Sequence, residues 1–419
     1  LARLHQELRL HLPDVLDALV AAGIHLIPWR DRMPPAVDDG VVRPGDDDVV
    51  AFGSRRTTVE HVLRGVLCNE PGVSVRIGVA VEGLVPGRSV IPGVPHVVGV
   101  RTASGESIDA DLVLDVSGRR SALSTWLADL GARPPLREVE ENGLMYFTRY
   151  FRVRPGCEFP RQHGSLLADL PYVEAFAFPA DNGVFSVTCQ AYAADKGMRL
   201  LKDPAAFMAG MAAVPRIAEW IDPERSEPIT GMTSMAKLED CYRRFVVEGV
   251  PVATGVLAVG DSAAYTNPAL GRGSSLAFVH ARLLAETLDE TGLDFAALAC
   301  HFDQLTEAAI VPWFRSSVAV DRQRGARMAA VLADEPLPQP DPSDTPAVMA
   351  AAMRLASTVD PVVFMAFNRI VHLMAQPAEV MRDGDVVQRC IEVWDRRHEL
   401  ALEPEGPERK VMVDLLASA

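Results

Sequence analysis

The chain is 419 residues long and 48% hydrophobic, which is enough to bury the core of a globular protein with two or three subdomains. Its 41 basic and 56 acidic residues give a formal net charge of -15. This charge repels nucleic acids and anionic lipid surfaces. We therefore expect no nucleic-acid partner.

The cysteines and the apolar runs restrict the location of the protein. Six cysteines are scattered along the chain, with no CxxC pair and no histidine cluster at the spacing of metal ligands, so we expect reduced cysteines and no metal site. No apolar run reaches the roughly 20 residues of a membrane helix. The first residues do not have the pattern of a signal peptide. These features predict a cytoplasmic protein without a membrane span.

The first 125 residues predict helices followed by strands. Leucines recur at helical spacing from Leu1 to Leu12, and a second helix is expected from Pro13 to a stop at Gly23. Thr57 to Leu67 has an apolar helical stripe, and Val73 to Val85 alternates as a strand does. Two β-rich runs then surround a Ser-Gly turn, and the second, Ala110 to Val116, is almost continuously apolar, which predicts a buried strand.

The middle and the end of the chain differ in character. Residues 126–245 carry aromatic and β-branched runs with a helical stretch near Pro204 to Trp220, which predicts an inserted sheet domain. The segment "EPLPQPDPSDTP" contains five prolines between Pro336 and Pro346 and predicts a loop. The apolar run "PVVFMAFNRIVHLMAQ" is too short to span a bilayer, so a buried helix is the favoured interpretation.

The stretch "GVLAVGDSAAYTNPALGRGSSLAFVHARLLAETL", residues 255–288, places an acid at the end of an apolar strand. Val256 to Val259 is the strand, and Gly260 permits a sharp exit from it. Asp261 then lies at the carboxyl end of the strand, where open α/β sheets bind their ligands. A carboxylate at that position suits a ligand with hydroxyl donors.

A rigid turn and a helix follow the acid. Pro268, Gly271 and Gly273 have no bulky flexible side chains, so the backbone N–H groups can approach a flat ligand closely. The helix is expected to begin near Gly273, and its amino terminus carries roughly half a positive charge and unpaired N–H donors. A ribityl chain near Asp261 and a pyrimidine ring that becomes anionic on reduction would use these features, so the pattern favours a flavin.

These residues resemble the glutathione-reductase-type flavoproteins, in the branch of the p-hydroxybenzoate hydroxylase-like monooxygenases, squalene epoxidases, geranylgeranyl reductases and flavin-dependent halogenases. The shared motif is a Gly-Asp pair, a proline seven residues after the Asp, and Gly-x-Gly. Here it comprises Gly260, Asp261, Pro268, Gly271 and Gly273. The resemblance implies that the Asp contacts the ribityl chain of FAD and that the Pro and the glycines line the flavin ring.

Two further stretches resemble the same family. "DLVLDVSGRRSAL", residues 111–123, is similar to a strand that ends near the cofactor's pyrophosphate, which implies roles for Gly118 and Arg119. "SRRTTVEHVLRGVL", residues 54–67, is similar to a helix whose first arginine reaches the flavin. Arg56 fits that register best, and Arg55 is the alternative. The whole turn looks closest to poorly characterised actinobacterial FAD-dependent oxidoreductases, although Ala269 replaces their serine.

The sequence also departs from the family pattern. The family opens with a strand, a GxGxxG loop and an acid after the next strand, and these would lie before Leu1, so we expect the FAD-binding domain to be incomplete at its amino terminus. Ser117-Gly118 replaces the Asp-Gly of NADPH-using aromatic hydroxylases, which leaves NAD(P)H as one candidate electron donor. Ala264 stands where those hydroxylases often have histidine, so no catalytic residue is assigned.

The expected fold class is α/β, with a Rossmann-like FAD-binding domain in residues 1–125 and 246–295. A mixed β-sheet substrate domain is inserted at 126–245, and a helical region occupies 296–419. The expected function is that of an FAD-dependent oxidoreductase, a monooxygenase-type hydroxylase or epoxidase acting on an apolar or aromatic small molecule. The alternatives are a flavin-dependent reductase of the geranylgeranyl reductase kind and a non-catalytic flavoprotein scaffold. The oligomeric state stays open.

Structural interpretations compete with several of these functional ones. Asp261 could cap a helix, and Arg272 could project into solvent. The imidazoles of His163 and His280 are isolated in sequence, and packing or solvent contact is the default for both. The aromatic residues of the inserted domain are expected mainly in its core; these are Tyr146, Phe147, Tyr150, Phe151, Phe176, Phe178 and Phe185.

Overall fold

The structure is a computed structural model that describes residues 1–165, 167–400 and 405–419. The chain forms two compact units, each assembled from separate segments. Unit 1 consists of Leu1–Val66, Gly143–Leu238 and Gln323–Ala419, and unit 2 consists of Leu67–Asn142 and Glu239–Arg322. The four-part domain division expected from the sequence stays a prediction.

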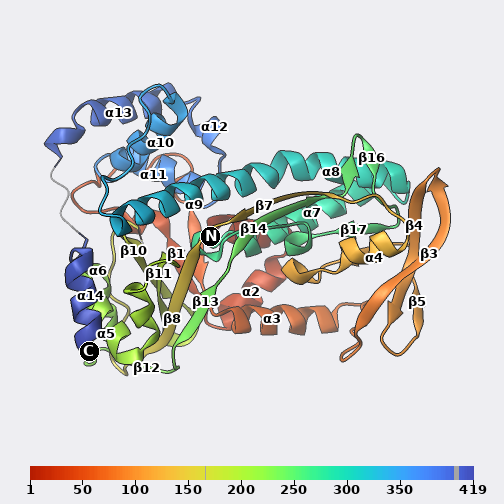
Figure 1. Cartoon of the computed structure of the whole chain (residues 1–419), viewed down its shortest axis with the longest axis horizontal. Coiled ribbons are helices and arrows are strands. Elements are labelled where there is room, and N and C mark those ends of the chain that lie inside the picture. Colours follow the sequence, from red (N-terminus) through yellow and green to blue (C-terminus); the bar gives the residue numbers. More distant parts are fainter. Residues whose placement is uncertain (166, 401–404) are drawn as a thin grey trace. The chain divides into compact units, whose positions relative to one another are not determined.

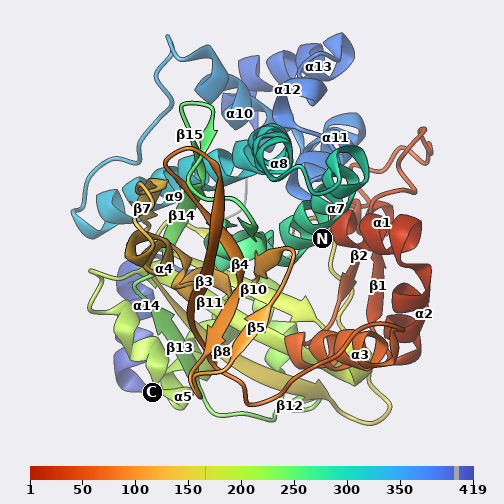
Figure 2. The ribbon, with the colours of Figure 1, turned by 90° about the vertical axis from the view of Figure 1, so that its right-hand side faces the viewer.

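Unit 1 is built on an antiparallel sheet of six strands. The strands are β8 (Leu144–Val153), β9 (Leu167–Leu170), β10 (Val173–Pro179), β11 (Val184–Tyr192), β12 (Ser226–Pro228) and β13 (Thr233–Ala236). Their order is β12-β8-β11-β10-β9, with β13 also paired to β8, and Figure 2 shows β8, β10 and β11 as its central strands. The expected sheet in the middle of the chain is therefore present.

One face of this sheet carries the largest hydrophobic cluster of the unit. Phe147, Phe151 and Phe185 belong to it, with the rings of Phe151 and Phe185 stacked 5.3 Å apart. Helices α5 (Pro204–Ala212) and α14 (Arg409–Ser418) contribute buried side chains and lie side by side (Figure 1). Phe176 and Phe178 alternate with the core residues Ala175 and Ala177 along β10, so they point to the opposite face.

Helices and a small sheet complete unit 1. A two-stranded antiparallel sheet pairs β1 (His25–Pro28) with β2 (Val50–Gly53). The remaining helices are α1 (Ala2–His11), α2 (Pro13–Ala21), α3 (Arg56–Asn69), α6 (Pro215–Ala218), α10 (Thr345–Ala356), α11 (Pro361–Val371), α12 (Pro377–Val380) and α13 (Gly384–Asp395), and the short 3-10 turns are η1 (Trp29–Arg32), η3 (Asp181–Gly183), η4 (Met198–Lys202), η5 (Glu219–Ile221) and η8 (Arg397–Glu399). Helix α9 (Val311–Leu332) runs from unit 2 into unit 1.

Several local predictions for these segments are confirmed. Helices α1 and α2 meet at Pro13, and the proline-rich segment between α9 and α10 has no regular structure. Helix α11 buries Val363, Phe364 and Met365, as expected for its apolar run. No single helix within residues 1–165, 167–400 and 405–419 has the length and apolar composition that a membrane crossing requires; α10 and α11 reach them only as a pair bent by 117°.

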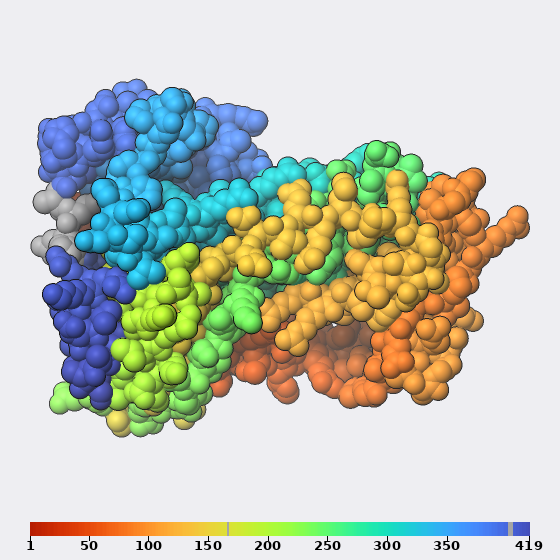
Figure 3. Space-filling model, in the orientation of Figure 1, coloured from red at the N-terminus to blue at the C-terminus, as the bar shows by residue number. Residues whose placement is uncertain are grey.

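Unit 2 combines small sheets with long helices. The strands are β3 (Val81–Ile91), β4 (Val94–Thr102), β5 (Ser107–Asp109), β6 (Val113–Asp115), β7 (Leu136–Glu141), β14 (Glu239–Arg244), β15 (Val246–Val247), β16 (Val250–Pro251), β17 (Val256–Ala258) and β18 (Ala264–Tyr265), and the helices are α4 (Leu123–Asp129), α7 (Gly273–Thr291), α8 (Phe295–Ala309) and the first half of α9. Strands β3, β4 and β5 form one antiparallel sheet, and β18, β14 and β7 form another. Figure 3 shows the segment of α4 and β7 (gold) at the surface, in agreement with the exposed residues of β7.

The candidate site depends on the parallel pair of β6 and β17. Val256 lies opposite Val113, and Ala258 lies opposite Asp115, so both strands end at the same edge. All three residues of β17 are buried, as predicted. The prediction of a buried strand at Ala110 to Val116 is wrong: Leu114 is 42% exposed and Val116 71%. The reason is that β6 pairs only with β17 among the described strands.

The strand predicted from Val73 to Val85 is also misplaced. Strand β3 begins at Val81, and residues 73–80 are exposed and lie outside any strand. Gly78 adopts a φ of 74°, a left-handed conformation that interrupts an extended chain. The alternation of apolar and polar residues in segment 73–80 therefore led to the wrong prediction of a strand for a solvent-exposed turn.

Candidate functional site

Two tight turns meet at the carboxyl ends of β6 and β17. The turn η2 (Gly118–Arg120) follows β6, and η6 (Gly260–Ser262) follows β17. The N–H of Gly118 donates to the hydroxyl oxygen of Ser262 at 2.9 Å, and the N–H of Val259 donates to the carbonyl oxygen of Asp115 at 3.0 Å. These bonds hold the two turns against each other.

The carboxylate of Asp115 stabilises the first turn through hydrogen bonds to residues of that turn. Its buried carboxylate accepts from the N–H of Ser117 at 3.0 Å and from the hydroxyls of Ser117 and Ser121. A carboxylate that receives three donors has its hydrogen-bonding capacity largely used within the turn. The other acid at this edge is Asp261, which is exposed.

Asp261 lies between two glycines that the sequence analysis singled out. A Cβ atom added to Gly118 would lie 4.0 Å from the Cβ of Asp261, and one added to Gly273 would lie 3.8 Å from its Oδ1. Gly118 has a φ of 81° and Gly260 one of 64°, conformations that favour glycine at both positions. Three predicted site residues from separate segments are thus neighbours, and side chains at the two glycines would narrow the approach to the carboxylate.

The amino terminus of α7 forms another side of this site. Gly271 has a φ of 62°, and α7 starts at Gly273 as predicted. The N-cap residue Arg272 makes no side-chain hydrogen bond to the first turn of the helix. Unpaired N–H groups at a helix amino terminus attract anions and carbonyl oxygens, so this end of α7 suits the anionic edge of a ligand.

Arg272 is buried in unit 2, which corrects the alternative that it projects into solvent. It is 5% exposed, and its guanidinium donates to the carbonyl oxygen of Trp313 at 3.1 Å and to the hydroxyl of Ser317 at 2.8 Å. Its Cζ also lies 5.5 Å from the centre of the Trp313 ring. The arginine therefore ties the turn before α7 to the first half of α9.

The other end of the turn is anchored to β14. The backbone N–H of Asn267 donates to Oδ1 of Asp240 at 2.7 Å, and the side chain of Asn267 accepts from the N–H of Ala269 at 3.2 Å. Asn267 thereby caps the short turn η7 (Pro268–Leu270), on which Pro268 is exposed. The predicted ring-lining residues Pro268, Gly271 and Gly273 thus lie on one turn that is held at both ends.

Sequence reasoning gave no role at the site to two residues whose hydrogen bonds support it. Arg243 on β14 donates to the carbonyl oxygens of Ser262 at 2.9 Å and Arg119 at 3.0 Å, so it bridges both turns. His280 on α7 accepts from the N–H of Gly260 at 3.0 Å. Neither residue belongs to a recognisable local motif, and the helical register of His280, facing back toward the strand end, was the only signal available.

The predicted arginines have different environments. Arg119 is exposed on η2, beside Gly118. Arg56 lies in unit 1, with its side chain 89% exposed and paired with Glu60 at 2.5 Å. Arg55 is bound to the buried carboxylate of Asp181 through its N–H at 2.6 Å and its guanidinium. Burial acts to raise the pKa of Asp181, but the hydrogen bonds from Arg55 and Thr58 outweigh it and hold that pKa well below its usual range.

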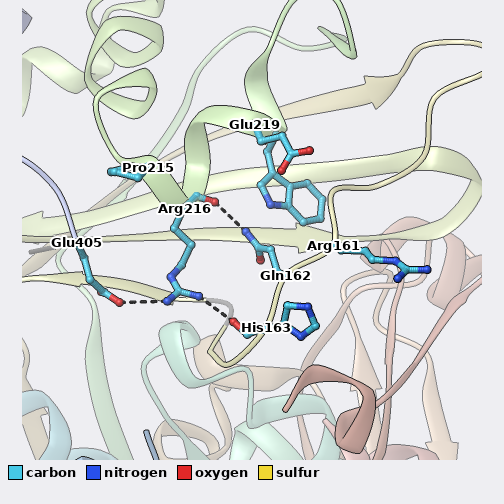
Figure 4. A pocket seen from close by; sticks show the side chains of 8 residues that line it. Arg161, Gln162, His163, Pro215, Arg216, Glu219 and Glu405 are labelled. Atoms are coloured by element: carbon cyan, nitrogen blue, oxygen red, sulfur yellow. Dashed lines mark hydrogen bonds and ion pairs between the residues drawn. The ribbon is translucent and has the colours of Figure 1, made fainter. Parts of the chain in front are cut away.

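Unit 1 contains a pocket of about 410 Å³ (Figure 4). Arg216 pairs with Glu405 at 3.3 Å and donates to the carbonyl oxygen of His163 at 3.0 Å, while Gln162 donates to the carbonyl oxygen of Arg216 at 2.8 Å. These polar groups are bonded to one another. Within the described ranges of the chain, no group of three His, Cys, Asp or Glu side chains could hold a metal ion.

Comparison with known proteins identifies a relative in sequence and several solved structures with a similar fold. No family model matches the chain. Protein Rv3254 of Mycobacterium tuberculosis (strain ATCC 25618 / H37Rv) is 26% identical over 349 residues, which cover 76% of this chain and 68% of that protein. The flavin-dependent brominase Bmp2 has a TM-score of 0.57 at 16% identity, with 92% of this chain and 87% of that one covered.

A second solved structure gives the same result. PqsL of Pseudomonas aeruginosa in complex with 2-aminobenzoylacetate has a TM-score of 0.53 at 16% identity, with 79% of this chain and 87% of that one covered. PqsL is described as a probable FAD-dependent monooxygenase. The mixed α/β fold of this chain is therefore similar to the folds of Bmp2 and PqsL.

Proposed function

We propose that this protein is an FAD-dependent oxidoreductase of the monooxygenase type. The observation that carries the proposal is the position of Asp261. Its carboxylate lies at the carboxyl ends of two parallel strands, between Gly118 and the amino terminus of α7. Open α/β sheets bind nucleotide cofactors at this kind of edge, and the fold shared with Bmp2 and PqsL supports a flavin.

The proposal gives each site residue a role. The carboxylate of Asp261 accepts hydrogen bonds from the ribityl hydroxyls, and Gly118 and Arg119 lie toward the pyrophosphate. Pro268 and the glycines of the following turn line the flavin ring, whose anionic form is stabilised by the α7 dipole. Arg56 is proposed to reach the same cofactor. Bound FAD would supply the electrons that activate oxygen.

The proposed substrate is an apolar or aromatic small molecule. The face of the unit 1 sheet opposite its main core carries the stacked rings of Phe176 and Phe178, 5.4 Å apart. The same face carries the hydroxyls of Thr148 and Thr188, which are hydrogen-bonded at 2.9 Å. Rings beside a few hydroxyl groups suit an aromatic ligand with polar substituents. The complex of PqsL with 2-aminobenzoylacetate adds support.

Oxygen consumption separates the proposal from its chemical alternative. A hydroxylase or epoxidase supplied with FAD, NAD(P)H as the proposed donor and an aromatic substrate consumes oxygen in step with an oxygenated product. A reductase of the geranylgeranyl reductase kind yields reduced product without incorporating oxygen. Mass spectrometry of the product under ¹⁸O₂ decides between them, since label in the product supports the monooxygenase and its absence from a reduced product contradicts it.

If residues 1–419 do not bind FAD, the non-catalytic scaffold becomes the better account. The six free cysteines support a cytoplasmic location as part of this proposal.

A further inference from the structure

A single arginine connects the two turns at the carboxyl ends of β6 and β17. Nη1 of Arg243 donates to the carbonyl oxygen of Ser262 at 2.9 Å, and Nη2 donates to the carbonyl oxygen of Arg119 at 3.0 Å. Each nitrogen of the planar guanidinium therefore holds a different turn. Because the guanidinium is a rigid fork, it sets the separation of the two carbonyl oxygens, and with it the alignment of η2 and η6.

The backbone of β14 holds η6 at the same place. The N–H of Arg243 donates to the carbonyl oxygen of Ala263 at 2.8 Å, directly after Ser262. The neighbouring Tyr242 lies opposite Ala264 in the register of β14 and β18. The guanidinium of Arg243 thus reaches η2 from a strand that is itself bound to the end of η6.

An aromatic ring restricts the arginine side chain. The Cζ atom of Arg243 lies 5.3 Å from the centre of the Tyr265 ring, within the range of cation–π attraction. Tyr265 is buried, and its hydroxyl donates to Oε1 of Glu239. Arg137 on β7 donates to the same oxygen at 3.3 Å. The ring is fixed through its hydroxyl group, so the guanidinium packs against a surface that is held in place.

The bridge joins two parts of the proposed cofactor site, and all of its residues belong to unit 2. The turn η6 carries Asp261, the proposed acceptor for the ribityl hydroxyls, while η2 carries Gly118 and Arg119, which are proposed to lie toward the pyrophosphate. A ligand that binds both turns at once gains from their alignment, because a preformed site lowers the entropic cost of binding. A ligand that reaches Asp261 but not η2 does not use this alignment.

We propose that Arg243 is a positioning residue that aligns η2 with η6 and thereby makes the site prefer FAD to riboflavin. The inference rests on the proposed function, because it takes the roles of Asp261 and Gly118 from there. FAD has a pyrophosphate beyond its ribityl chain, whereas riboflavin ends at that chain. Loss of the guanidinium should therefore weaken FAD binding more than riboflavin binding. A role in stability alone would weaken both to the same extent.

Fluorescence titrations with FAD and with riboflavin test this preference. Arg243→Met keeps a long side chain beside the Tyr265 ring but has no donors for the two carbonyl oxygens. We expect it to raise the Kd of FAD about tenfold, the effect of losing one hydrogen bond to a charged group, and the Kd of riboflavin less than about twofold. Arg243→Lys has one nitrogen in place of two separate donors. It should raise the Kd of FAD about threefold and provides the test if Arg243→Met folds poorly.

Arg244→Met is the matched control on the same strand. Side chains of successive strand residues point to opposite faces, and Arg244 binds Asp303 on α8 through two nitrogens, at 3.0 and 2.7 Å. Its replacement removes an arginine from β14 whose bonds go to α8 rather than to η2 or η6. The ratio of the riboflavin Kd to the FAD Kd should stay at the wild-type value. An unchanged ratio in Arg243→Met, or the same change in both variants, would overturn the proposal.

Amide hydrogen exchange in the cofactor-free chain gives a readout that does not need a flavin. The N–H of Gly118 donates to the hydroxyl of Ser262 across the two turns, so its protection measures how firmly the turns are held together. NMR should show that Arg243→Met speeds its exchange about tenfold and that Arg244→Met does not. A wild type that binds neither flavin would refute the proposed function, whereas unchanged exchange of Gly118 in Arg243→Met would refute the alignment of the turns by Arg243.

Discussion

The hydrogen bonds of His280 fix its tautomer and, through it, the turn at Gly260. The hydroxyl of Thr306 donates to the carbonyl oxygen of Phe302 at 2.7 Å, so it can only accept from Nε2 of His280, at 2.9 Å. Nδ1 then carries the lone pair that accepts the N–H of Gly260 at 3.0 Å. The imidazole is 1% exposed, and burial lowers its pKa to about 4. A neutral histidine is therefore part of the support of Asp261.

This arrangement predicts a pH dependence of stability. An unfolded histidine has a pKa near 6.5, above the folded value of about 4, so the unfolded chain binds more protons between these values. The stabilisation is present above about pH 6.5 and is lost as the pH falls toward 4. His280→Gln should reduce the change of the urea unfolding midpoint with pH over this range. It should also lower the free energy of unfolding by about 1 kcal/mol at pH 7. His61→Gln, at an exposed position of α3, should leave the profile unchanged, and an equal effect of both variants would contradict this role.

The contrast between predicted and missed residues has a physical basis. Asp261, Gly118 and Gly273 follow strand ends or begin a helix, so short-range spacing locates them. Arg243 bonds the backbone carbonyl oxygen of Arg119, which is 124 residues away in the sequence, and one sequence contains no sign of such a pairing. Arg272 was assigned to solvent as an alternative because a Gly-Arg-Gly turn does not reveal that α9 packs behind it.

At the level of elements, the turn before α7 is fixed at both ends by hydrogen bonds to neighbouring elements. Asp240 on β14 holds Asn267, and Arg272 holds the first half of α9. Between these anchors lie Pro268 and Gly271, both exposed. A turn fixed at its ends can present backbone N–H groups in one geometry, which lowers the entropic cost of ordering it around a flat ligand.

Removing the anchor on α9 should damage both stability and binding. Arg272→Leu leaves the carbonyl oxygen of Trp313 and the hydroxyl of Ser317 without the guanidinium, so we expect a loss of about 2 kcal/mol in the free energy of unfolding. Arg282→Leu removes the same charge from α7, where Arg282 forms an i,i+4 ion pair with Glu286, a kind of pair worth less than about 0.5 kcal/mol. Urea unfolding of both variants tests the difference, and similar losses would show that the hydrogen bonds of Arg272 contribute no more to stability than a surface ion pair.

The strands show where element prediction fails. Strand β17 was correctly predicted because all three of its side chains are buried between neighbours. The exposure of Leu114 on β6 depends on which strands lie beside it, and that information is not contained in an apolar run. The start of β3 was misplaced because residues before Gly78 alternate in polarity without being paired.

At the scale of the whole molecule, the site residues are concentrated in unit 2. Gly118, Asp261 and Gly273 all belong to it, whereas Arg56 belongs to unit 1. Unit 1 has its own buried polar centre, in which Arg324 pairs with Glu174 at 2.8 Å. Each unit joins segments that are far apart in sequence, and local patterns could not reveal how these segments associate.

This concentration predicts a localised response to the cofactor. Ligand binding to the native state suppresses local opening of the segments that it contacts. Added FAD should therefore slow amide hydrogen exchange in residues 117–120 and 260–276 by tenfold or more. Helices α5 and α14 of unit 1, packed in the main core, should be unaffected. Equal slowing throughout the chain would point to a general effect rather than to binding at these turns.

The central claim is that Asp261 binds a flavin, and an equilibrium titration with FAD tests it most directly. The absorption spectrum between 350 and 500 nm is followed for the wild type, Asp261→Ala and the exposed control Asp289→Ala. Loss of a hydrogen bond to a charged group costs roughly 1.5 to 3 kcal/mol, so Asp261→Ala should raise the Kd at least about tenfold, while the control keeps the wild-type value. Equal FAD binding by Asp261→Ala and the wild type would contradict the assignment.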